Sequence, residues 1–595
     1  MMLLVKSLAL AVGMFLLITS VLASSNDQPP ASNPMVSLPA KLRQIMSENR
    51  ERFFPPLHPS LEDIVNSFVP RNLDEDEHYM VFEVLRQARS RHMAGRGYFA
   101  FMHAFGATVD FAASLTHEQL GKEIQFLFDL LRHGYDGYLY FGGDDVFLPI
   151  RDATLERLAS MSDPLLVYSY LNDLLVPAFQ GVIADNHFLI QHIRFGPSAH
   201  VPFMSEEFIL RRGGGGFVTE IDRVLYKVIE VKGLPSPSLD GILPTLTPGG
   251  EFAWVFGLVT PDSGRDTMEI TVRFEDAATN ESHSRLVNLQ RVDSPRLSTG
   301  SIIARHEIDG VTILENRRLS GSSRSFLPLE DRDNFLRSGY ELRDVPVLVM
   351  DLRGNTGGNG SLASQWVKMY TGQEPQLNSL FAWSNLQVST VASALMNFFT
   401  PFFTPLHLLT PLYPLTQESV IERPSERARA RDPRFAMTGV SEASVPGSLP
   451  LTTSVSRTLP HVPIPNENFV IVLTDKNIGS AGELFVGYLR QLENVLVVGT
   501  NTAGAFLNGN VGSAILPYSG LAVRFGTQLN LRHDLSQFEG VGFMPDLWVP
   551  PGESLERVLR FVKRHGLQDN FGIFLRYELA LEGETFNKPG VSSAF

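Results

Sequence analysis

The chain of 595 residues contains no cysteine. Disulfide bonds, a cysteine nucleophile and thiolate metal sites are therefore excluded. The same absence excludes an N-terminal cysteine that could carry a lipid. No metal-ligand spacing stands out elsewhere, because "RHEIDG" has Gly310 where an H-E-x-x-H motif needs its second histidine. We therefore expect neither a metal nor an organic cofactor.

Positive charge is also scarce. The chain has 50 Lys and Arg against 64 Asp and Glu, a formal net charge of -14 and a pI near 5.6. This balance argues against nucleic acid or an anionic membrane as the main partner. A content of 44% hydrophobic and 19% charged residues is typical of a globular protein, and the length predicts two to four domains.

Long hydrophobic runs are few, and the first is N-terminal. Lys6 precedes the apolar run 7–23, which ends in the small residues Ala23 and Ser24. This pattern predicts a signal peptide over 1–23, cut after Ala23, although an uncleaved anchor is the alternative. The run is slightly short for a membrane span. A cysteine-free exported chain is more typical of bacteria, so we expect a secreted or periplasmic protein.

A second apolar stretch, "VASALMNFFTPFFTPLHLLTPLYPLT", lies in a long insertion over 376–465. Four prolines interrupt the stretch, at Pro401, Pro405, Pro411 and Pro414, so it does not predict a transmembrane helix. The insertion either packs on the surface of the core or forms a lid or apolar wall beside a site. The residues leave both possibilities open.

Hydrophobic periodicity divides the rest of the chain. A flexible linker is expected over 24–40, followed by a helical domain over 41–205. In that domain Thr116 and Gln119 form a capping-box pattern, and a later helical run ends at His187. Runs such as "RVLYKVIEVKG", "EFAWVFGLV" and "MEITVRFED" predict a small β-rich domain over 206–298.

Strand and helix patterns alternate over 299–570, and residues 571–595 read as a C-terminal tail. The runs "VPVLVMD" (345–351), "FVIVLTD" (469–475) and "NVLVVGT" (494–500) predict buried strands. Helical patterns follow the first two. We therefore expect an α/β domain with a mostly parallel sheet and flanking helices, preceded by the helical and β-rich domains.

Two segments at predicted strand ends could carry chemistry. Ser480 begins "SAGE", which fits a capping box and, taken alone, favours a structural role. The turn "DLRGNTGGNG", from Asp351 to Gly360, follows a neighbouring buried strand, and its backbone N–H groups could face an oxyanion. Its glycine spacing and the lack of a following lysine do not fit a nucleotide-binding loop.

The segments "VPVLVMDLRGNTGG" and "VIVLTDKNIGSAGELF…VVGTNTAG" resemble the tail-specific, or C-terminal processing, serine protease superfamily. This superfamily also includes the tricorn-protease core and retinoid-binding repeat proteins. "IADNHF" and "FEGVGFMPDLWV" resemble two further motifs of the family. The resemblance covers roughly residues 120–560. It implies a PDZ-like module in the β-rich region, and no family motif matches the insertion.

The resemblance implies that Ser480 is the nucleophile. It also implies an oxyanion hole formed by the N–H of Ala481 and one N–H of Gly357 or Gly358. The tail-specific branch activates its serine with a lysine after a T-x-G motif. Here "NTAGAF" has Ala505 at that position, so the Ser–Lys pair is missing.

The tricorn-like branch uses a histidine and a glutamate, which match His187 and Glu539. Histidine suits a general base, since its ordinary pKa of about 6.5 is near neutral pH. The carboxylate of Glu539 could orient the ring, with Asp185 and Asn186 as supporting residues. His187 alone fits a buried structural histidine, and Glu539 alone fits a loop carboxylate. Their joint presence with Ser480 in matched motifs favours a triad.

The sequence therefore predicts a serine endopeptidase that hydrolyses protein or peptide substrates through Ser480, His187 and Glu539. In a competent site a ring nitrogen of His187 should approach the serine oxygen to about 3 Å, and Glu539 should face the other nitrogen. Two alternatives remain. One is a non-catalytic carrier of an apolar ligand on the same fold, and the other is a peptide-binding protein that acts through its β-rich domain.

Overall fold

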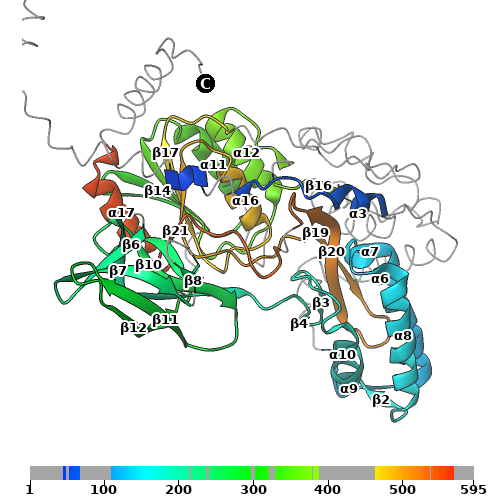
Figure 1. The fold of residues 1–595 in the computed structure, drawn as a ribbon. Coiled ribbons are helices and arrows are strands. Elements are labelled where there is room, and N and C mark those ends of the chain that lie inside the picture. Colours follow the sequence, from blue (N-terminus) through cyan, green and yellow to red (C-terminus); the bar gives the residue numbers. More distant parts are fainter. Residues whose placement is uncertain are drawn as a thin grey trace, which may run out of the picture. The chain divides into compact units, whose positions relative to one another are not determined.

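The computed structural model describes eleven ranges of the chain (Figure 1). They are 44–48, 53–67, 109–213, 216–232, 234–235, 240–295, 302–319, 329–377, 380–386, 463–535 and 538–568. The expected signal peptide, linker and C-terminal tail, and nearly all of the insertion, lie outside these residues. The chain divides into two units, residues 1–48 and residues 49–595, and of the first unit only the short helical segment 44–48 is described. The elements described next belong to the second unit.

The α/β segment predicted over 299–570 is built on a six-stranded sheet in the order β13-β14-β15-β17-β18-β21. The strands are β13 (Ile303–Ile308), β14 (Val311–Asn316), β15 (Val347–Asp351), β17 (Phe469–Thr474), β18 (Val495–Gly499) and β21 (Leu547–Trp548). All neighbours pair in parallel except β13 with β14. Every residue of β15, β17 and β18 is buried, as expected for strands covered on both faces. The predicted strands at 345–351, 469–475 and 494–500 are thus confirmed.

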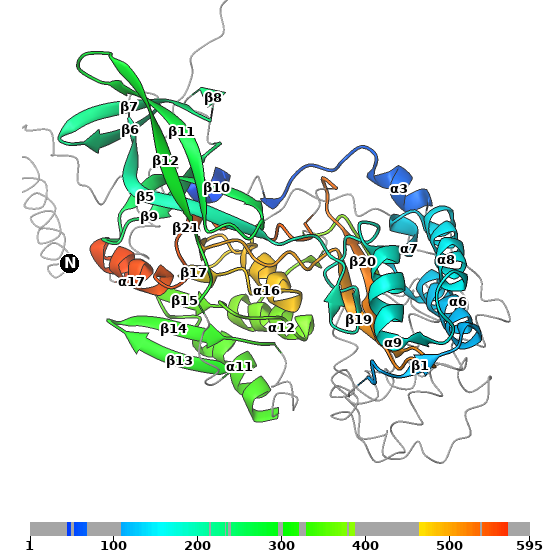
Figure 2. The ribbon, with the colours of Figure 1, turned by 90° about the horizontal axis from the view of Figure 1, so that it is seen from below.

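Helices cover this sheet. They are α11 (Leu329–Glu341), α12 (Gly360–Thr371), α16 (Ala481–Leu489) and α17 (Ser554–Arg564). α12 packs on α11 and on α16 (Figure 2), and Trp366, Phe335 and Phe485 meet in the core between them. This core fixes the start of α16, which directly follows Ser480, against the sheet.

The helical region forms a second core. Its elements are β1 (Ser114–Leu115), α6 (His117–Gly134), α7 (Gly137–Tyr140), α8 (Gly143–Ala159), β2 (Leu165–Leu166), α9 (Val167–Ser169), the π-helix η1 (Tyr170–Leu175) and α10 (Val176–Phe179). β1 pairs with β2. Thr116 caps α6 in a capping box with Gln119, as predicted. The later helical run ends at Phe179 rather than at His187, because Gln180 is extended and Gly181 has a φ of +78°.

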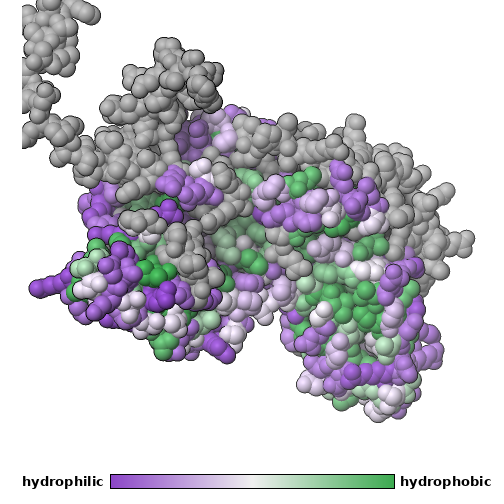
Figure 3. Space-filling view, viewed as in Figure 1, coloured by the Kyte–Doolittle hydropathy of each residue, from purple (hydrophilic) through white to green (hydrophobic). Residues whose placement is uncertain are grey.

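A hairpin from far along the chain completes this helical core. It consists of β19 (Asn508–Ile515) and β20 (Ala522–Leu531), and β20 also pairs with β3 (Leu189–Ile190) and β16 (Trp383–Leu386). β3 pairs in turn with β4 (Ile193–Arg194). Val523 and Phe525 of β20 pack with residues of α6 and η1, and Figure 3 shows hydrophobic residues gathered over this part. Because β20 pairs with β3, which follows His187 in the chain, the hairpin brings the segment after Ala505 close to His187.

The β-rich region consists of strands and turns. Its strands are β5 (His200–Gly213), β6 (Gly216–Ile221), β7 (Val224–Val231), β8 (Leu234–Pro235), β9 (Ile242–Leu246), β10 (Phe252–Pro261), β11 (Thr267–Asp276) and β12 (Ser282–Arg291). Antiparallel pairing runs β12-β11-β7-β6-β5, and β12 also pairs with β5, so these five strands close into a ring. The β-rich content is as predicted. The PDZ-like assignment stays a prediction.

An N-terminal segment, 53–67, ends in helix α3 (Leu61–Ser67). Leu61 and Val65 are buried against Leu529 and Leu531 of β20. The ring of Phe53 lies 4.8 Å from that of Phe543 and beneath the guanidinium of Arg490. Among the described residues, no helix combines the length and hydrophobicity that a membrane span requires.

Candidate active site

Ser480 lies in the turn between β17 and α16, as the sequence predicts. Its backbone has φ +53° and ψ −123°, a conformation that residues other than glycine rarely adopt. Strain of this kind costs about 1–3 kcal/mol and is concentrated at functional sites. The sharp turn between strand and helix is the arrangement that exposes a nucleophilic serine. The capping-box pattern with Glu483 is present as well, so the structural and functional interpretations coexist at this residue.

The glycine turn after β15 packs directly against the serine turn. A methyl group added to Gly357 would lie 3.0 Å from both Ser480 Cβ and Ala481 N, and 2.6 Å from the carbonyl oxygen of Gly479. Gly357 and Gly358 both have positive φ, at +100° and +137°. The predicted neighbourhood of Ser480 and the Gly357-Gly358 pair is therefore present, and it requires glycine at position 357.

The hydrogen bonds distinguish the two glycines. Gly357 N donates to Asn355 Oδ1 at 2.9 Å, so this donor is already engaged. The N–H groups of Gly358 and Ala481 donate to no other residue within the described part of the chain. Ala481 is the first residue of α16, where the helix dipole favours negative charge. Of the alternatives from the sequence, the pair Gly358 and Ala481 is the one left open for an oxyanion.

Glu483 has a larger role than helix capping. Its Oε2 accepts from Ser480 N at 3.0 Å and from Ala505 N at 2.8 Å, and its Oε1 accepts from Gly504 N at 2.8 Å and Thr502 Oγ1 at 2.6 Å. The carboxyl is buried, which raises its pKa to about 7 against the effect of these donors. Glu483 thus joins the serine turn to the 502–505 segment, a contact for which the sequence offered only the S-x-x-E spacing.

The ring of His187 lies in a turn before β3. Its backbone N donates to Asp185 Oδ1 at 2.7 Å, and its Nδ1 lies 3.9 Å from the same oxygen. Nδ1 is buried and has no hydrogen-bond partner among the residues that the structure describes. Burial, and then the positive charges of Arg194 and Arg524, lower the pKa of His187 to about 4. The imidazole is therefore neutral at pH 7, as a general base must be.

Glu539 is buried in the loop before β21. Its Oε1 accepts from Phe506 N and Leu507 N, both at 2.6 Å, and its Oε2 accepts from Asn186 N at 3.0 Å. Burial and then the charge of Asp185 raise the pKa of Glu539. Asn186 Nδ2 also donates to Gly504 O at 2.7 Å. Glu539 and Asn186 thus hold the His187 turn against the 504–507 segment.

The structure brings these residues together only in part. Ser480 connects through Glu483 and Gly504 to Asn186, the neighbour of His187. Among the described residues, however, Ser480 has no hydrogen bond with His187, and Glu539 has no ion pair with it. The carboxylate nearest to Nδ1 is Asp185, which also accepts from Tyr135 Oη at 3.1 Å. Lys476 Nζ, four residues before the serine, donates to Asp293 of the β-rich region at 2.9 Å.

A cavity opens beside Glu539 where the helical region and the α/β segment meet. The helical region contributes Tyr140, Phe141 and Ala184, and the α/β segment contributes mainly apolar residues: Phe381, Phe506, Leu507, Leu531, Leu535 and Phe538, with Asn530 and Arg532. Neither Ser480 nor His187 lines this cavity. The described residues contain no group of three His, Asp or Glu side chains that could hold a metal ion.

Residues 325–549 match the model of peptidase family S41. The chain carries an S41 peptidase domain. This match confirms the superfamily expected from the motifs, and the chain is a serine-type peptidase. The fold is the mixed α/β fold of these peptidases. No curated protein matches the chain.

Solved structures resemble the chain distantly. Mature CPAF is 14% identical with a TM-score of 0.35, covering 77% of this chain and 97% of that one. The photosystem II D1 C-terminal processing protease is 13% identical with a TM-score of 0.30, covering 75% and 97%. The tricorn protease is 10% identical with a TM-score of 0.30, covering 76% and 37%.

Proposed function

We propose that this S41 peptidase is an endopeptidase in which Ser480 attacks the carbonyl carbon of a peptide bond. The conformation of Ser480 carries the proposal: it is a strained, positive-φ serine at a strand–helix turn, packed on a glycine turn. Two backbone N–H groups beside it donate to no described residue. A helix cap needs neither the strain nor the glycine turn. This combination also favours an enzyme over the carrier and peptide-binding alternatives.

His187 takes the serine proton as the bond to carbon forms and later delivers it to the leaving amine. Gly358 N–H and Ala481 N–H hold the oxyanion. Glu539 is the third member of the set, and its contacts support His187 through Asn186 N and the 504–507 segment. The reaction requires a His187 ring nitrogen to approach Ser480 Oγ. We propose that this contact forms in the substrate complex, since catalytic hydrogen bonds often tighten only there.

The proposed substrates are proteins or peptides, and the proposed location is outside the cytoplasm, after removal of residues 1–23. The acidic net charge supports neither nucleic acid nor an anionic membrane as a partner. N-terminal sequencing of the exported protein should return a chain that begins near Ser24. A chain that retains Met1 would instead indicate a membrane anchor.

A fluorophosphonate probe tests the central claim, because only an activated serine reacts with it. The wild-type protein should be labelled, and Ser480→Ala should not. Ser160 directly follows helix α8 and bonds to Arg157 O, so it supplies the matched control: Ser160→Ala should be labelled like wild type. If the wild-type protein stays unlabelled and binds apolar ligands, the result would contradict the peptidase proposal and favour the non-catalytic carrier.

A further inference from the structure

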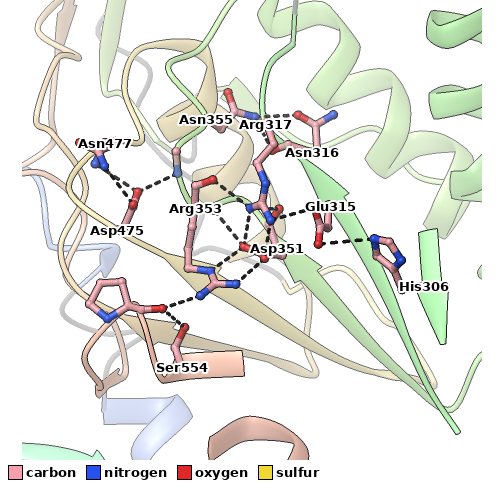
Figure 4. Close-up of polar contacts among 12 residues, drawn as sticks. His306, Glu315, Asn316, Arg317, Asp351, Arg353, Asn355, Asp475, Asn477 and Ser554 are labelled. Carbon is pink, nitrogen blue, oxygen red and sulfur yellow. Dashed lines mark hydrogen bonds and ion pairs between the residues drawn. The ribbon is translucent and has the colours of Figure 1, made fainter. Parts of the chain in front are cut away.

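Asn355 is buried between the glycine turn and the serine turn, and its side chain bonds in two directions, one of which, toward Asn316, is drawn in Figure 4. Its Oδ1 accepts from Gly357 N at 2.9 Å. Its Nδ2 donates to Asn316 Oδ1 at 2.7 Å and to Asn316 O at 3.1 Å. The amide therefore ties the glycine turn to the end of β14 and engages the one N–H that could compete with Gly358 for an oxyanion.

The backbone of Asn355 holds the other turn. Its carbonyl oxygen accepts from Gly479 N at 3.1 Å, one residue before Ser480. A methyl group at Gly482 would lie only 2.6 Å from this oxygen and 3.0 Å from Asn355 Oδ1. The first turn of α16 thus rests on Asn355 at a distance that a side chain would prevent. A single residue contacts both halves of the proposed oxyanion hole.

The surroundings of Asn355 are fixed by a buried ionic cluster. Arg353 Nη2 and Arg317 Nη2 donate to Asp351 Oδ2 at 2.6 and 2.8 Å, and these charges outweigh burial and lower the pKa of Asp351 to about 2. Gly354 N donates to Asp475 Oδ1 at 2.9 Å, which attaches the glycine turn to the residue after β17. Figure 4 shows these contacts converging on the turn. Rotation of Asn355 would break several buried bonds at once.

We propose that Asn355 is the positioning residue of the oxyanion hole. It directs Gly358 N–H to the oxyanion by engaging Gly357 N–H, and it sets Ala481 N–H by holding Gly479. Asn355 touches neither the substrate nor the serine oxygen, so it acts only through these backbone donors. The inference rests on the proposed peptidase function. It adds a residue that fixes how well the transition state, rather than the substrate, is bound.

The test is Asn355→Ala, with Asn359→Ala as the matched control. Asn359 lies in the same turn and caps α12 through Ser361 N, but it does not bond to Gly357 or Gly479. With dye-labelled casein, Asn355→Ala should lower kcat by about 10- to 100-fold and leave KM within about twofold, because the developing charge exists only in the transition state. A peptide boronate, which mimics the tetrahedral state, should lose affinity by a similar factor. Asn359→Ala should keep the wild-type kcat.

Asn355→Asp supplies a second variant if the alanine variant does not fold. It keeps the acceptor for Gly357 N but places an oxygen opposite Asn316 Oδ1 and O, so its kcat should fall below those of wild type and Asn359→Ala while its KM stays within about twofold. An Asn355→Asp variant that folds and keeps the wild-type kcat would overturn the proposal. The proposal is overturned if Asn355→Ala raises KM alone, or if it loses no more kcat than Asn359→Ala at a temperature where both are folded. Substantial turnover in Ser480→Ala would overturn the peptidase mechanism itself, which is a different result.

Discussion

The two halves of the proposed site are built differently. The nucleophile half consists of two turns on adjacent parallel strands, β15 and β17, and its contacts are complete: glycine turn, serine turn and Asn355 are all in hydrogen-bond or van der Waals contact. The base half gathers the Asp185–His187 turn and Glu539 around the 504–507 segment. There the backbone contacts are made, whereas the His187 ring reaches neither Ser480 nor Glu539.

The two halves therefore differ in how far their geometry depends on other segments of the chain. The nucleophile half follows from the register of one sheet, so it should tolerate changes in the other domains. The base half depends on the Asp185–His187 turn and on two segments that follow it by more than 300 residues, 504–507 and Glu539 (504 − 187 = 317, 539 − 187 = 352). Glu483 links the two halves through its bonds with Ser480 N and Gly504 N. Changes in the base half should therefore affect both geometry and stability.

The largest effect is expected at Ser480. Ser480→Ala should reduce turnover of labelled casein by several orders of magnitude, because the nucleophile is lost. Ser480→Gly should be equally inactive but more stable than Ser480→Ala by about 1 kcal/mol, since glycine adopts a φ of +53° without strain. Thermal unfolding measures the difference. If the two variants are equally stable, the strain at Ser480 is absent in solution and the main argument for a nucleophile is lost.

His187→Ala should cause the next largest loss of activity. Without a base the serine is a weak nucleophile, and a loss of about 10³-fold or more in kcat is expected. Labelling by the fluorophosphonate probe should slow in parallel. His192 on the same turn region is exposed and provides the control, because His192→Ala should label at the wild-type rate. Normal labelling of His187→Ala would show that His187 does not activate Ser480 and that the base half has only a structural role.

Glu539→Gln and Asp185→Asn separate the two carboxyls of the base half. All three partners of Glu539 are backbone N–H donors, so the amide of glutamine must face at least one of them. Asp185 has one N–H partner and one hydroxyl partner, and a hydroxyl can accept. Glu539→Gln should therefore lower stability by about 1–3 kcal/mol, and Asp185→Asn by less.

Activity gives the second comparison between these variants. Because Asp185 is the carboxylate next to Nδ1, Asp185→Asn should still lower kcat while the protein remains folded. The measurements are denaturant unfolding and kcat on labelled casein. A stable Glu539→Gln variant with a large loss of kcat would show instead that Glu539 faces the imidazole directly during the reaction.

The sequence predicted what depends on local pattern. The apolar runs gave the strands β15, β17 and β18, and glycine spacing together with the family motifs placed the turns beside Ser480. The strain at Ser480 was missed, because Ile478 stands where a nucleophile elbow has its first glycine and no rule links this spacing to φ +53°. Asp185 is held beside the His187 ring by a local bond from His187 N and by tertiary contacts, of which the bond from Tyr135 Oη is the clearest. No periodicity in the sequence encodes those contacts.

The smallest expected effect concerns the protonation of His187. Since burial, Arg194 and Arg524 lower its pKa to about 4, the acid limb of kcat/KM should fall below the ordinary histidine value of 6.5, not near neutrality. Removing a positive charge makes protonation easier, so Arg194→Gln should move the limb to higher pH. Arg194 is exposed, and the shift should be about 0.2–0.5 pH unit and shrink at high salt.

The control is Arg223→Gln, which makes the same charge change on an exposed turn of the β-rich region and should not move the acid limb. If both variants shift the limb equally, the cause is net charge rather than proximity to His187. A limb unchanged by Arg194→Gln at low salt would mean that His187 is not the titrating base.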